Sequence, residues 1–297
     1  EHTCMVAQAL VVAAGDVTKF ARSLATQLRR WLLALPAGTG LATLKACVRL
    51  CLGLGPERSG VFSAGNGPAM RSAILGVCYG HDLDTLCDLV RASTRITHTD
   101  PKAEFGALAV ALAAHLAATG DAVSPHEYLG SLRVALGSAA DEFLALVEQA
   151  VESVAAGQTT EAFAEQLGLD HGVTGYTYHT VPVALHAWLR HPRDYRSAVV
   201  AIIRCGGDTD STAAIVGGIV GAVVGKEGIP PDWLDNVCEW PRSVRWMEKL
   251  GHRLTEVCSR GEAQRPLPLP FYQVFLRNIF FVLVVLAHGL RRLLPPY

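Results

Sequence analysis

The chain carries almost no excess of charge of either sign. Its 297 residues include 26 Lys and Arg against 27 Asp and Glu, a net charge of −1 at pH 7. Such a balance provides no general attraction to nucleic acid or to anionic lipid, so general nucleic-acid binding is not expected. The eight cysteines form no Cys-x-x-Cys pair and no Cys/His cluster at zinc spacing. We therefore expect no zinc site and a reducing, cytoplasmic environment.

The sequence also lacks sustained alternation of apolar and polar residues between hairpin turns, so helices are favoured over strands. Half of its residues are hydrophobic, enough to form a sizeable core. Apolar residues recur at helical spacing instead, as at Phe20 and Leu24. We predict an all-α fold with a helical domain over residues 1–262, a Pro-rich linker over 263–270 and an apolar tail helix over 271–297.

Turn residues divide the predicted domain into helices of ordinary length. The expected helices are two within 1–35, Leu41–Leu54, Ala73–Tyr79, one ending near Ala92, Ala103–Ala118, Pro125–Leu136, Ala139–Ala156, Glu161–Leu167, Val181–Leu189, Tyr195–Ile203, one after Asp210, and Asp232–Leu254. The helix after Asp210 carries Gly217, Gly221 and Gly225 at four-residue spacing, which predicts close approach by another helix. Because it is too short to span a membrane, a buried central helix is expected.

The tail contains an unbroken apolar run, Ile279–Ala287, bounded by Arg277 and by Arg291-Arg292. The whole tail reaches the lower limit of about 17 residues for a spanning helix only if the polar residues near its start are tolerated. Three interpretations stay open, in order of preference: a helix docked on the domain or a partner, an interfacial anchor, and a true span. Weak membrane or partner contact through 271–294, with peripheral membrane association, is part of the prediction.

The most informative segment is Arg204–Gly225, in which two glycines precede Asp208-Thr209-Asp210-Ser211-Thr212 and a small-residue helix follows. Two carboxylates and three hydroxyls gather at the start of that helix, and such hard oxygens suit Mg²⁺, Mn²⁺ or Ca²⁺. An ordinary N-cap needs only one carboxylate. Because Asp208 and Asp210 repel each other unless a cation or proton lies between them, metal binding or catalysis is favoured over a simple cap.

Two motifs with similar letters do not fit this segment. A calcium-binding EF-hand loop starting at Asp208 requires Glu at its twelfth position, where the chain has Ile219. A phosphatase with an aspartate nucleophile places Asp-x-Asp directly after a buried strand. Here Arg204-Cys205-Gly206-Gly207 intervenes after the apolar run Ala198–Ile203.

Two further polar loops carry candidate binding residues. Gly65-Asn66-Gly67 leads into an apolar helix, whose free N–H groups could hold an anion such as a diphosphate with Arg71 near by. The competing interpretation is an ordinary turn. His98 lies in a turn before Pro101, where a lone histidine is more often structural than catalytic.

Together these segments resemble the ADP-ribosylglycohydrolase family, typified by the dinitrogenase-reductase-activating glycohydrolase. Gly206–Ile215 matches that family's C-terminal metal motif nearly letter for letter. Gly65–Arg71 is similar to its internal Gly-Asn-Gly loop, and Thr97-His98 followed by Pro101 is similar to its next polar segment. The resemblance runs from residue 1 to about residue 260 and leaves the tail outside it.

The resemblance implies a compact orthogonal all-α domain that holds two Mg²⁺ ions, or Mn²⁺. It implies a hydrolase that cleaves the glycosidic bond between ADP-ribose and an acceptor, in an ADP-ribosylated protein or an ADP-ribose-containing small molecule. Asp208, Asp210 and Ser211 would be metal ligands, and the two aspartates would be catalytic. The residues assigned to the substrate are Gly65, Asn66, Gly67 and His98 at the ADP-ribose and Tyr176 against the adenine.

One part of the family's pattern is missing, because its first long helix opens with Ser/Thr-Asp-Asp-Thr and the chain contains no Asp-Asp-Thr. Either Glu1-His2-Thr3 is a degenerate version of that motif, or the chain begins immediately after it. The second is preferred, because Glu1–Val11 continues as the following helix and no initiator Met is present. The chain would then hold half a metal site and be poorly active. The alternatives are a non-catalytic ADP-ribose-binding module and a purely structural helical protein.

Overall fold

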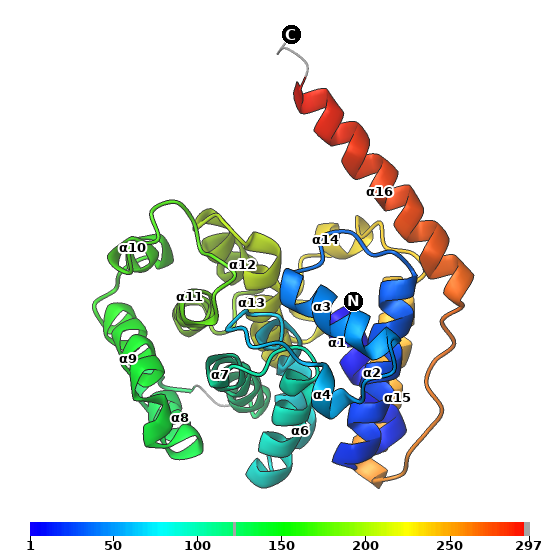
Figure 1. Cartoon of the computed structure of the whole chain (residues 1–297). Helices are drawn as coiled ribbons and strands as arrows, with labels where there is room; N and C mark the ends of the chain where they lie inside the picture. Colours follow the sequence, from blue (N-terminus) through cyan, green and yellow to red (C-terminus); the bar gives the residue numbers. More distant parts are fainter. Residues whose placement is uncertain (121–122, 294–297) are drawn as a thin grey trace.

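The computed structural model describes residues 1–120 and 123–293 (Figure 1). Within those ranges the chain forms helices and no strand, and its extended pairings are three isolated β-bridges, Val61 with His98, Gly65 with Tyr176, and Val173 with Gly207. The predicted all-α fold is confirmed. Each bridge involves a loop that carries a predicted site residue or its neighbour. Backbone pairing therefore holds these loops together.

The helices fall into three groups along the chain. The first group is α1 (His2–Ala13), α2 (Val17–Leu33), α3 (Leu41–Cys51), α4 (Pro56–Ser59), η1 (Ala69–Arg71), α5 (Ala73–Tyr79) and α6 (Leu83–Arg95). The second is α7 (Pro101–Ala118), α8 (Pro125–Leu136), η2 (Ser138–Ala140), α9 (Asp141–Ala155), α10 (Thr160–Gln166), α11 (Thr177–Arg190), α12 (Tyr195–Arg204) and α13 (Thr209–Val224). The third is η3 (Lys226–Gly228), α14 (Pro231–Asp235), α15 (Val244–Arg260) and α16 (Phe271–Leu293).

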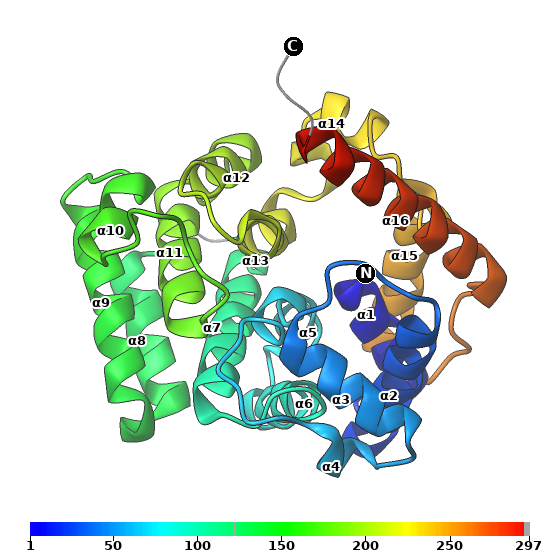
Figure 2. The same cartoon turned by 45° about the horizontal axis from the view of Figure 1, so that its top comes forward.

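The helix α7 lies between two hydrophobic cores (Figure 2). One core gathers buried residues of α1, α2, α3, α6 and α15, and the other gathers those of α8, α9, α11, α12 and α13. From α7, Leu108 and Ala111 face the first core, while Val110 and Ala113 face the second. A helix that is apolar around its whole circumference belongs at the centre of a domain. α7 therefore lies at the centre of the domain, beside α11, whose residues 180–189 are all buried.

The helix α13 packs against α7 and α12. Ile215 and Ile219 are fully buried on its inner side. A Cβ atom at Gly217 would lie 2.8 Å from the hydroxyl oxygen of Tyr195 on α12, so the missing side chain admits that tyrosine. The predicted close approach is confirmed at Gly217. Gly225 instead ends the helix, with a φ of 63° that glycine adopts without strain.

The predicted helical region Asp232–Leu254 is broken in the structure, which corrects the sequence-based expectation. α14 ends before a loop that contains Pro241, and α15 begins only at Val244. Proline lacks a backbone donor and disfavours helical geometry in the residue before it, so the loop is locally encoded. Ser243 then caps α15 by accepting a hydrogen bond from the backbone N–H of Trp246.

Residues 261–270 carry no helix and run along α1. The side chain of Gln8 donates to the carbonyl of Leu267 at 2.9 Å and accepts from its N–H at 2.8 Å. Beyond this segment, α16 extends past the other helices in the view of Figure 1. Residues 294–297 of the predicted tail lie outside the described residues.

Candidate active site

The start of α13 is fixed by two glycines that precede it. Gly206 and Gly207 have φ angles of 69° and 76°, in the left-handed region that favours glycine. The carbonyl of Gly206 accepts from Val173, whose own carbonyl accepts from the N–H of Asp208 at 2.7 Å. A Cβ atom at Gly207 would lie 2.1 Å from the Val173 carbonyl oxygen. The glycine pair therefore lets the α10–α11 loop press against the chain just before Asp208.

Asp208 occupies the N-cap position of α13, but its side chain accepts none of the cap hydrogen bonds described in this structure. Its Oδ2 instead accepts a 2.7 Å hydrogen bond from Nδ2 of Asn66. The interpretation of Asp208 as a simple helix cap is therefore wrong. Its carboxylate is turned away from the helix amides and toward the Gly65-Asn66-Gly67 loop.

Asn66 is 7% exposed and is held from two directions. Its backbone N–H donates to the carbonyl of Gly175 at 2.9 Å, and its Nδ2 also donates to Oγ1 of Thr180 at 3.0 Å. Thr180 in turn donates to the carbonyl of Thr174 at 2.7 Å. A Cβ atom at Gly175 would lie 3.3 Å from Oδ2 of Asp208, so this glycine also lies directly against the carboxylate. Three separate segments thus meet at Asn66 and Asp208.

The second carboxylate, Asp210, lies in the first turn of α13 and is exposed. A hydrogen bond shared with the Asp208 carboxyl group, with smaller effects of burial and of the Asp208 charge, raises the pKa of Asp210 above its usual range. The pair therefore favours a shared proton or a bound cation. Ser211 follows on the same turn with a half-buried hydroxyl.

This donor set fits part of the coordination shell of a hard divalent cation. Two adjacent carboxylates and a hydroxyl are the oxygen ligands that Mg²⁺ prefers, and a cation could take the place of a proton shared by the two carboxylates. No group of three or more His, Cys, Asp or Glu side chains in the described ranges could hold a metal ion. Asp208, Asp210 and Ser211 could therefore provide only part of a coordination shell.

His98 is 3% exposed and lies under the glycine loop. A Cβ atom at Gly65 would be 3.0 Å from its Nε2, and one at Gly67 would be 3.0 Å from its Cε1. Its Nδ1 lies 2.9 Å from Oγ1 of Thr97. Burial, with a smaller contribution from the positive charge of Arg71, lowers the pKa of His98 to about 3. The ring is therefore neutral at physiological pH and supports the loop from below.

Arg71 does not take the role suggested for it. Its guanidinium group is fully buried, with Nε and Nη2 donating to Ser93 and Nη2 also donating to Oγ1 of Thr97 at 2.8 Å. Its Nη1 lies 3.3 Å from Nδ1 of His2. Burial lowers the pKa of Arg71 to about 10. The prediction that Arg71 assists anion binding is wrong, because all three nitrogens are used to brace the loop internally.

Tyr176 lies at the N-cap position of α11, beside the glycine loop that it pairs with through Gly65. Its hydroxyl accepts a 3.1 Å hydrogen bond from Nζ of Lys102. The same ammonium group donates to Glu142 at 2.9 Å and lies 4.5 Å from the centre of the Tyr178 ring. Sequence reasoning missed Lys102 and Thr180, because a lysine at a helix start and a threonine inside an apolar helix give no local signal.

The start of α1 lies on the other side of the glycine loop. Thr3 Oγ1 donates to the carbonyl of Met70 at 3.4 Å, and the His2 ring contacts Arg71. The Glu1 carboxylate accepts from Nε1 of Trp31 at 2.7 Å and from Arg242 at 2.6 Å. Glu1 and His2 therefore make structural contacts, and neither belongs to a three-ligand metal group in the part of the chain described.

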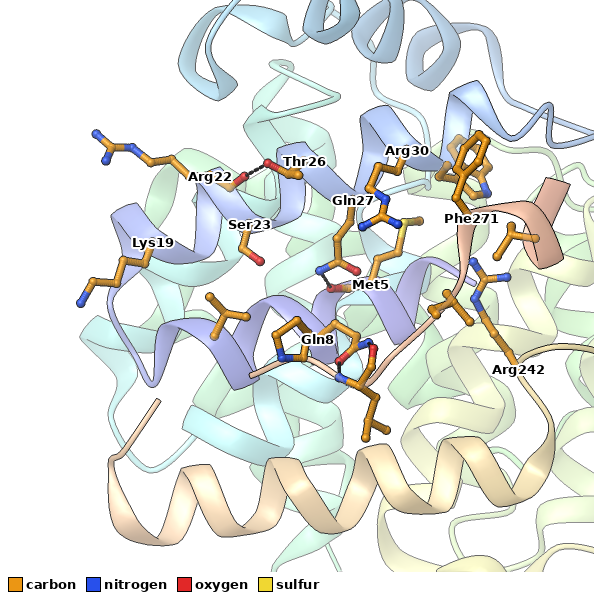
Figure 3. Close-up of a pocket in the computed structure, with 16 residues that line it drawn as sticks. Met5, Gln8, Lys19, Arg22, Ser23, Thr26, Gln27, Arg30, Arg242 and Phe271 are labelled. Atoms are coloured by element: carbon orange, nitrogen blue, oxygen red, sulfur yellow. Dashed lines mark hydrogen bonds between the residues drawn. The ribbon is translucent and has the colours of Figure 1, made fainter. Parts of the chain in front are cut away.

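A cavity of about 440 Å³ lies apart from these residues, between α1, α2 and the segment that enters α16 (Figure 3). Its lining includes Gln8, Arg30, Arg242 and Phe271. None of the predicted site residues borders it. The candidate site is therefore an arrangement of loops at the helix starts and is distinct from this cavity.

The sequence of the chain is similar to those of known proteins. A sequence profile of the ADP-ribosylglycohydrolase family matches residues 1–264. An uncharacterised protein of Archaeoglobus fulgidus is 30% identical over 237 residues, which cover 80% of this chain and 73% of that protein. The ADP-ribosylhydrolase ARH3 of Bos taurus is 31% identical over 221 residues, covering 66% of this chain and 59% of that protein. The chain spans about three fifths of the length of this ARH3 relative.

One more relative and one solved structure are also similar to this chain. The ARH3 protein of Homo sapiens is 30% identical over 222 residues, covering 66% of this chain and 60% of that protein. A solved structure named ADP-ribosylglycohydrolase-related protein complex superposes with a TM-score of 0.59 at 25% identity, covering 86% of this chain and 80% of that chain. The fold and the family profile extend over the same helical domain, and the chain belongs to the ADP-ribosylglycohydrolase family of hydrolases.

Proposed function

We propose that this protein hydrolyses the glycosidic bond between ADP-ribose and an acceptor, with a divalent cation, Mg²⁺ or Mn²⁺, held by Asp208, Asp210 and Ser211. The observation that carries the proposal is the 2.7 Å hydrogen bond from Asn66 to Asp208. It joins the proposed substrate loop to the proposed metal ligands. Family membership supports the reaction class.

The roles of the two aspartates follow from their surroundings. Asn66 fixes the orientation of the Asp208 carboxylate, so one oxygen is committed to the amide. Asp210 is exposed to solvent at the start of α13, which suits its carboxylate to accept a proton from an attacking water. A bound divalent cation supplies positive charge that orients the ribose hydroxyls and the water. The carboxylates also stabilise the positive charge that develops at the anomeric carbon as its bond breaks.

The substrate side of the site is formed by the glycine loop and its neighbours. Gly65 and Gly67 lack side chains where the His98 ring packs against them, and this neutral ring keeps the loop in place. We assign the ADP-ribose to this loop. Tyr176, fixed by Lys102, offers an aromatic ring against which the adenine stacks.

A second function is favoured by one observation, the incomplete set of metal ligands among the described residues. A non-catalytic module that binds ADP-ribose through the glycine loop requires no cation. Free ADP-ribose, titrated calorimetrically in EDTA, is expected to bind under this second function. Binding that requires Mg²⁺ supports the hydrolase.

The deciding experiment measures release of ADP-ribose from a protein pool that carries labelled ADP-ribose, with Mg²⁺ and with EDTA. Slow release by the chain that depends on Mg²⁺ is expected, because the set of ligands is partial, and it should be abolished in the Asp208→Asn, Asp210→Asn double variant. Asp170→Asn, an exposed carboxylate before Val173, provides the matched control. Release that is equal in EDTA, or unaffected by the double substitution, would overturn the proposal. Binding of ADP-ribose without any release would select the second function.

A further inference from the structure

The distal part of α16 is apolar on every side. Leu283, Val284, Val285 and Leu286 are consecutive, and each is between 47% and 59% exposed. Successive helical residues are rotated by about 100°, so four consecutive exposed positions cover the whole circumference. Phe280 and Leu290 extend the exposed apolar surface in both directions along the helix. The exposed apolar surface therefore surrounds the helix at these positions and is not confined to one stripe.

The first turns of α16 are docked on the domain, and this fixes where the helix leaves it. Val274 is 5% exposed, and the buried side chain of Asn278 donates to the carbonyl of Ala34 at 2.8 Å. Arg277 pairs with Glu239 at 2.6 Å. The preferred prediction of a docked helix thus holds for the base of α16, where these contacts lie. Beyond Asn278 most of the large apolar side chains are exposed.

The part of α16 beyond its docked base is long enough to enter a bilayer. Phe271–Arg292 comprises 22 residues, and an 18-residue window within it has a mean hydropathy of 1.8. Residues 279–292, which follow the docked base, measure about 21 Å at 1.5 Å per residue, more than half of the hydrocarbon thickness of about 30 Å. A core helix of a soluble protein has similar composition but is mostly buried, whereas only 11% of this window is buried. A signal sequence lies near an N-terminus, and α16 does not.

A lipid bilayer explains the all-round exposure better than a second helix does. A helix that pairs with one partner needs one apolar stripe, and its other faces stay polar. Hydrocarbon chains surround a helix and require every face to be apolar. Arg292 stands at the far end of the apolar part, where a long basic side chain can extend to lipid headgroups. Tyr272 and Trp240, both exposed, lie near the base, as aromatic residues do at membrane surfaces.

The cavity beside the base of α16 adds a charge preference. Phe271 and Val274 of α16 border it, as do four basic side chains, those of Lys19, Arg22, Arg30 and Arg242. Lys19 pairs with Asp16 and Arg242 with Glu1, so the charge preference depends on Arg22 and Arg30. None of the described residues that line it is acidic. In Figure 3 the Arg30 and Arg242 side chains extend toward the interior between α2 and the entering segment, while Lys19 and Arg22 point outward at the rim. Basic side chains at the opening suit the anionic headgroup of a lipid, and the apolar side chains along the walls suit its acyl chains.

We propose that α16 inserts into a phospholipid bilayer and anchors the hydrolase domain there, and that the cavity at its base receives an anionic lipid headgroup. The base contacts keep the domain at the membrane surface. The cavity then lies next to the point where α16 leaves the domain, within reach of the headgroups. The inference stands independently of the catalytic proposal, because no residue of the candidate active site takes part in it.

The test uses the full chain, purified in detergent and diluted into vesicles that are then separated by flotation. One set of vesicles contains phosphatidylcholine alone, and the other contains phosphatidylcholine mixed with phosphatidylglycerol. The wild-type chain is expected to float with both and to bind the anionic vesicles more tightly, by roughly thirtyfold for two basic side chains near the surface. The Leu283→Lys, Val285→Lys variant is expected to lose at least about tenfold in partition to both.

Two matched variants make the result specific. Val134→Lys together with Phe62→Lys adds the same charges at exposed apolar positions on the domain, and should float like the wild type. Arg22→Gln together with Arg30→Gln should float with phosphatidylcholine but lose the anionic preference. The proposal is overturned if the wild type does not float, or if the α16 variant floats equally well. It is also overturned if α16 drives concentration-dependent dimers and no vesicle binding. Equal binding to both vesicle types would refute the assignment of the cavity.

Discussion

The side-chain amide of Asn66 donates a 2.7 Å hydrogen bond to Oδ2 of Asp208, across 142 positions of sequence. Each partner belongs to a loop that is fixed by separate backbone contacts, Asn66 to Gly175 and Asp208 to Val173. The contact therefore depends on the packing of three segments and not on one flexible side chain. It sets the direction of a carboxylate that would otherwise cap its own helix.

Replacing Asn66 tests how much this orientation contributes. Asn66→Ala removes the donor and leaves Asp208 free to turn toward the α13 amides, so ADP-ribose release should fall by roughly 10- to 100-fold. Loss of a hydrogen bond to a charged group should also lower stability by about 1.5 to 3 kcal/mol. Steady-state kinetics and thermal unfolding measure the two effects. Asn236→Ala, at an exposed asparagine that bonds to its own helix, should change neither by as much.

The two glycines before Asp208 provide a matched pair for testing the backbone. Both have positive φ, but a Cβ atom at Gly206 meets only the Gly172 Cα at 3.8 Å, whereas one at Gly207 lies 2.1 Å from the Val173 carbonyl oxygen. Gly206→Ala should therefore cost about 1 to 2 kcal/mol of conformational strain. Gly207→Ala should cost about 4 kcal/mol or more, because backbone must move. Urea unfolding of both variants measures the difference, and equal destabilisation would contradict the proposed close approach.

The fold was largely predictable because the helices are separated by local signals. Apolar spacing and turn residues indicate the helices from 1 to 225, and Asp16 and Ser124 accept the cap hydrogen bonds of α2 and α8. The break between α14 and α15 was missed, since apolar spacing continues on both sides of Pro241. The central position of α7 was also missed, because the sequence of a helix that is apolar throughout does not indicate which helices pack against it.

The candidate site was predictable only where its residues are adjacent in sequence. Asp208, Asp210 and Ser211 form one motif, and the metal role assigned to them remains a prediction. Their contact with Asn66 depends on tertiary packing and no local pattern encodes it. For Arg71 the local pattern was misleading. An arginine beside a glycine turn suggested anion binding, yet its partners Ser93 and Thr97 come from another segment and bury it.

Removing the charge of Asp210 should change the stability without a cation and the stabilisation by Mg²⁺ in opposite directions. Its pKa is raised, so the folded state holds this proton more tightly than the unfolded state does. Without a cation, the stability contributed by the protonated form is lost as pH rises through that raised pKa. At neutral pH in EDTA, Asp210→Asn should therefore raise the Tm slightly, while the increase in Tm that Mg²⁺ gives the wild type should disappear. Asp170→Asn is the control in a thermal-shift titration, and an unchanged Mg²⁺ response in Asp210→Asn would exclude Asp210 as a ligand.

His98 makes the stability of the protein depend on pH in a direction that its burial determines. Its pKa is lowered from 6.5 to about 3, so between those values the unfolded chain binds a proton that the folded chain does not. Stability is therefore lost as pH falls below 6.5, by up to about 1.4 kcal/mol per pH unit for this histidine. His98→Asn retains a polar atom toward Thr97 but cannot ionise, so its stability should fall less steeply as the pH is lowered.

A second buried histidine, His186, has a pKa that burial lowers to about 4, so it contributes in the same direction and should leave part of the pH dependence in His98→Asn. Urea unfolding at a series of pH values measures the slopes, with His252→Asn at an exposed position as control. Identical slopes in wild type and His98→Asn would mean that His98 is solvated and not buried under the glycine loop.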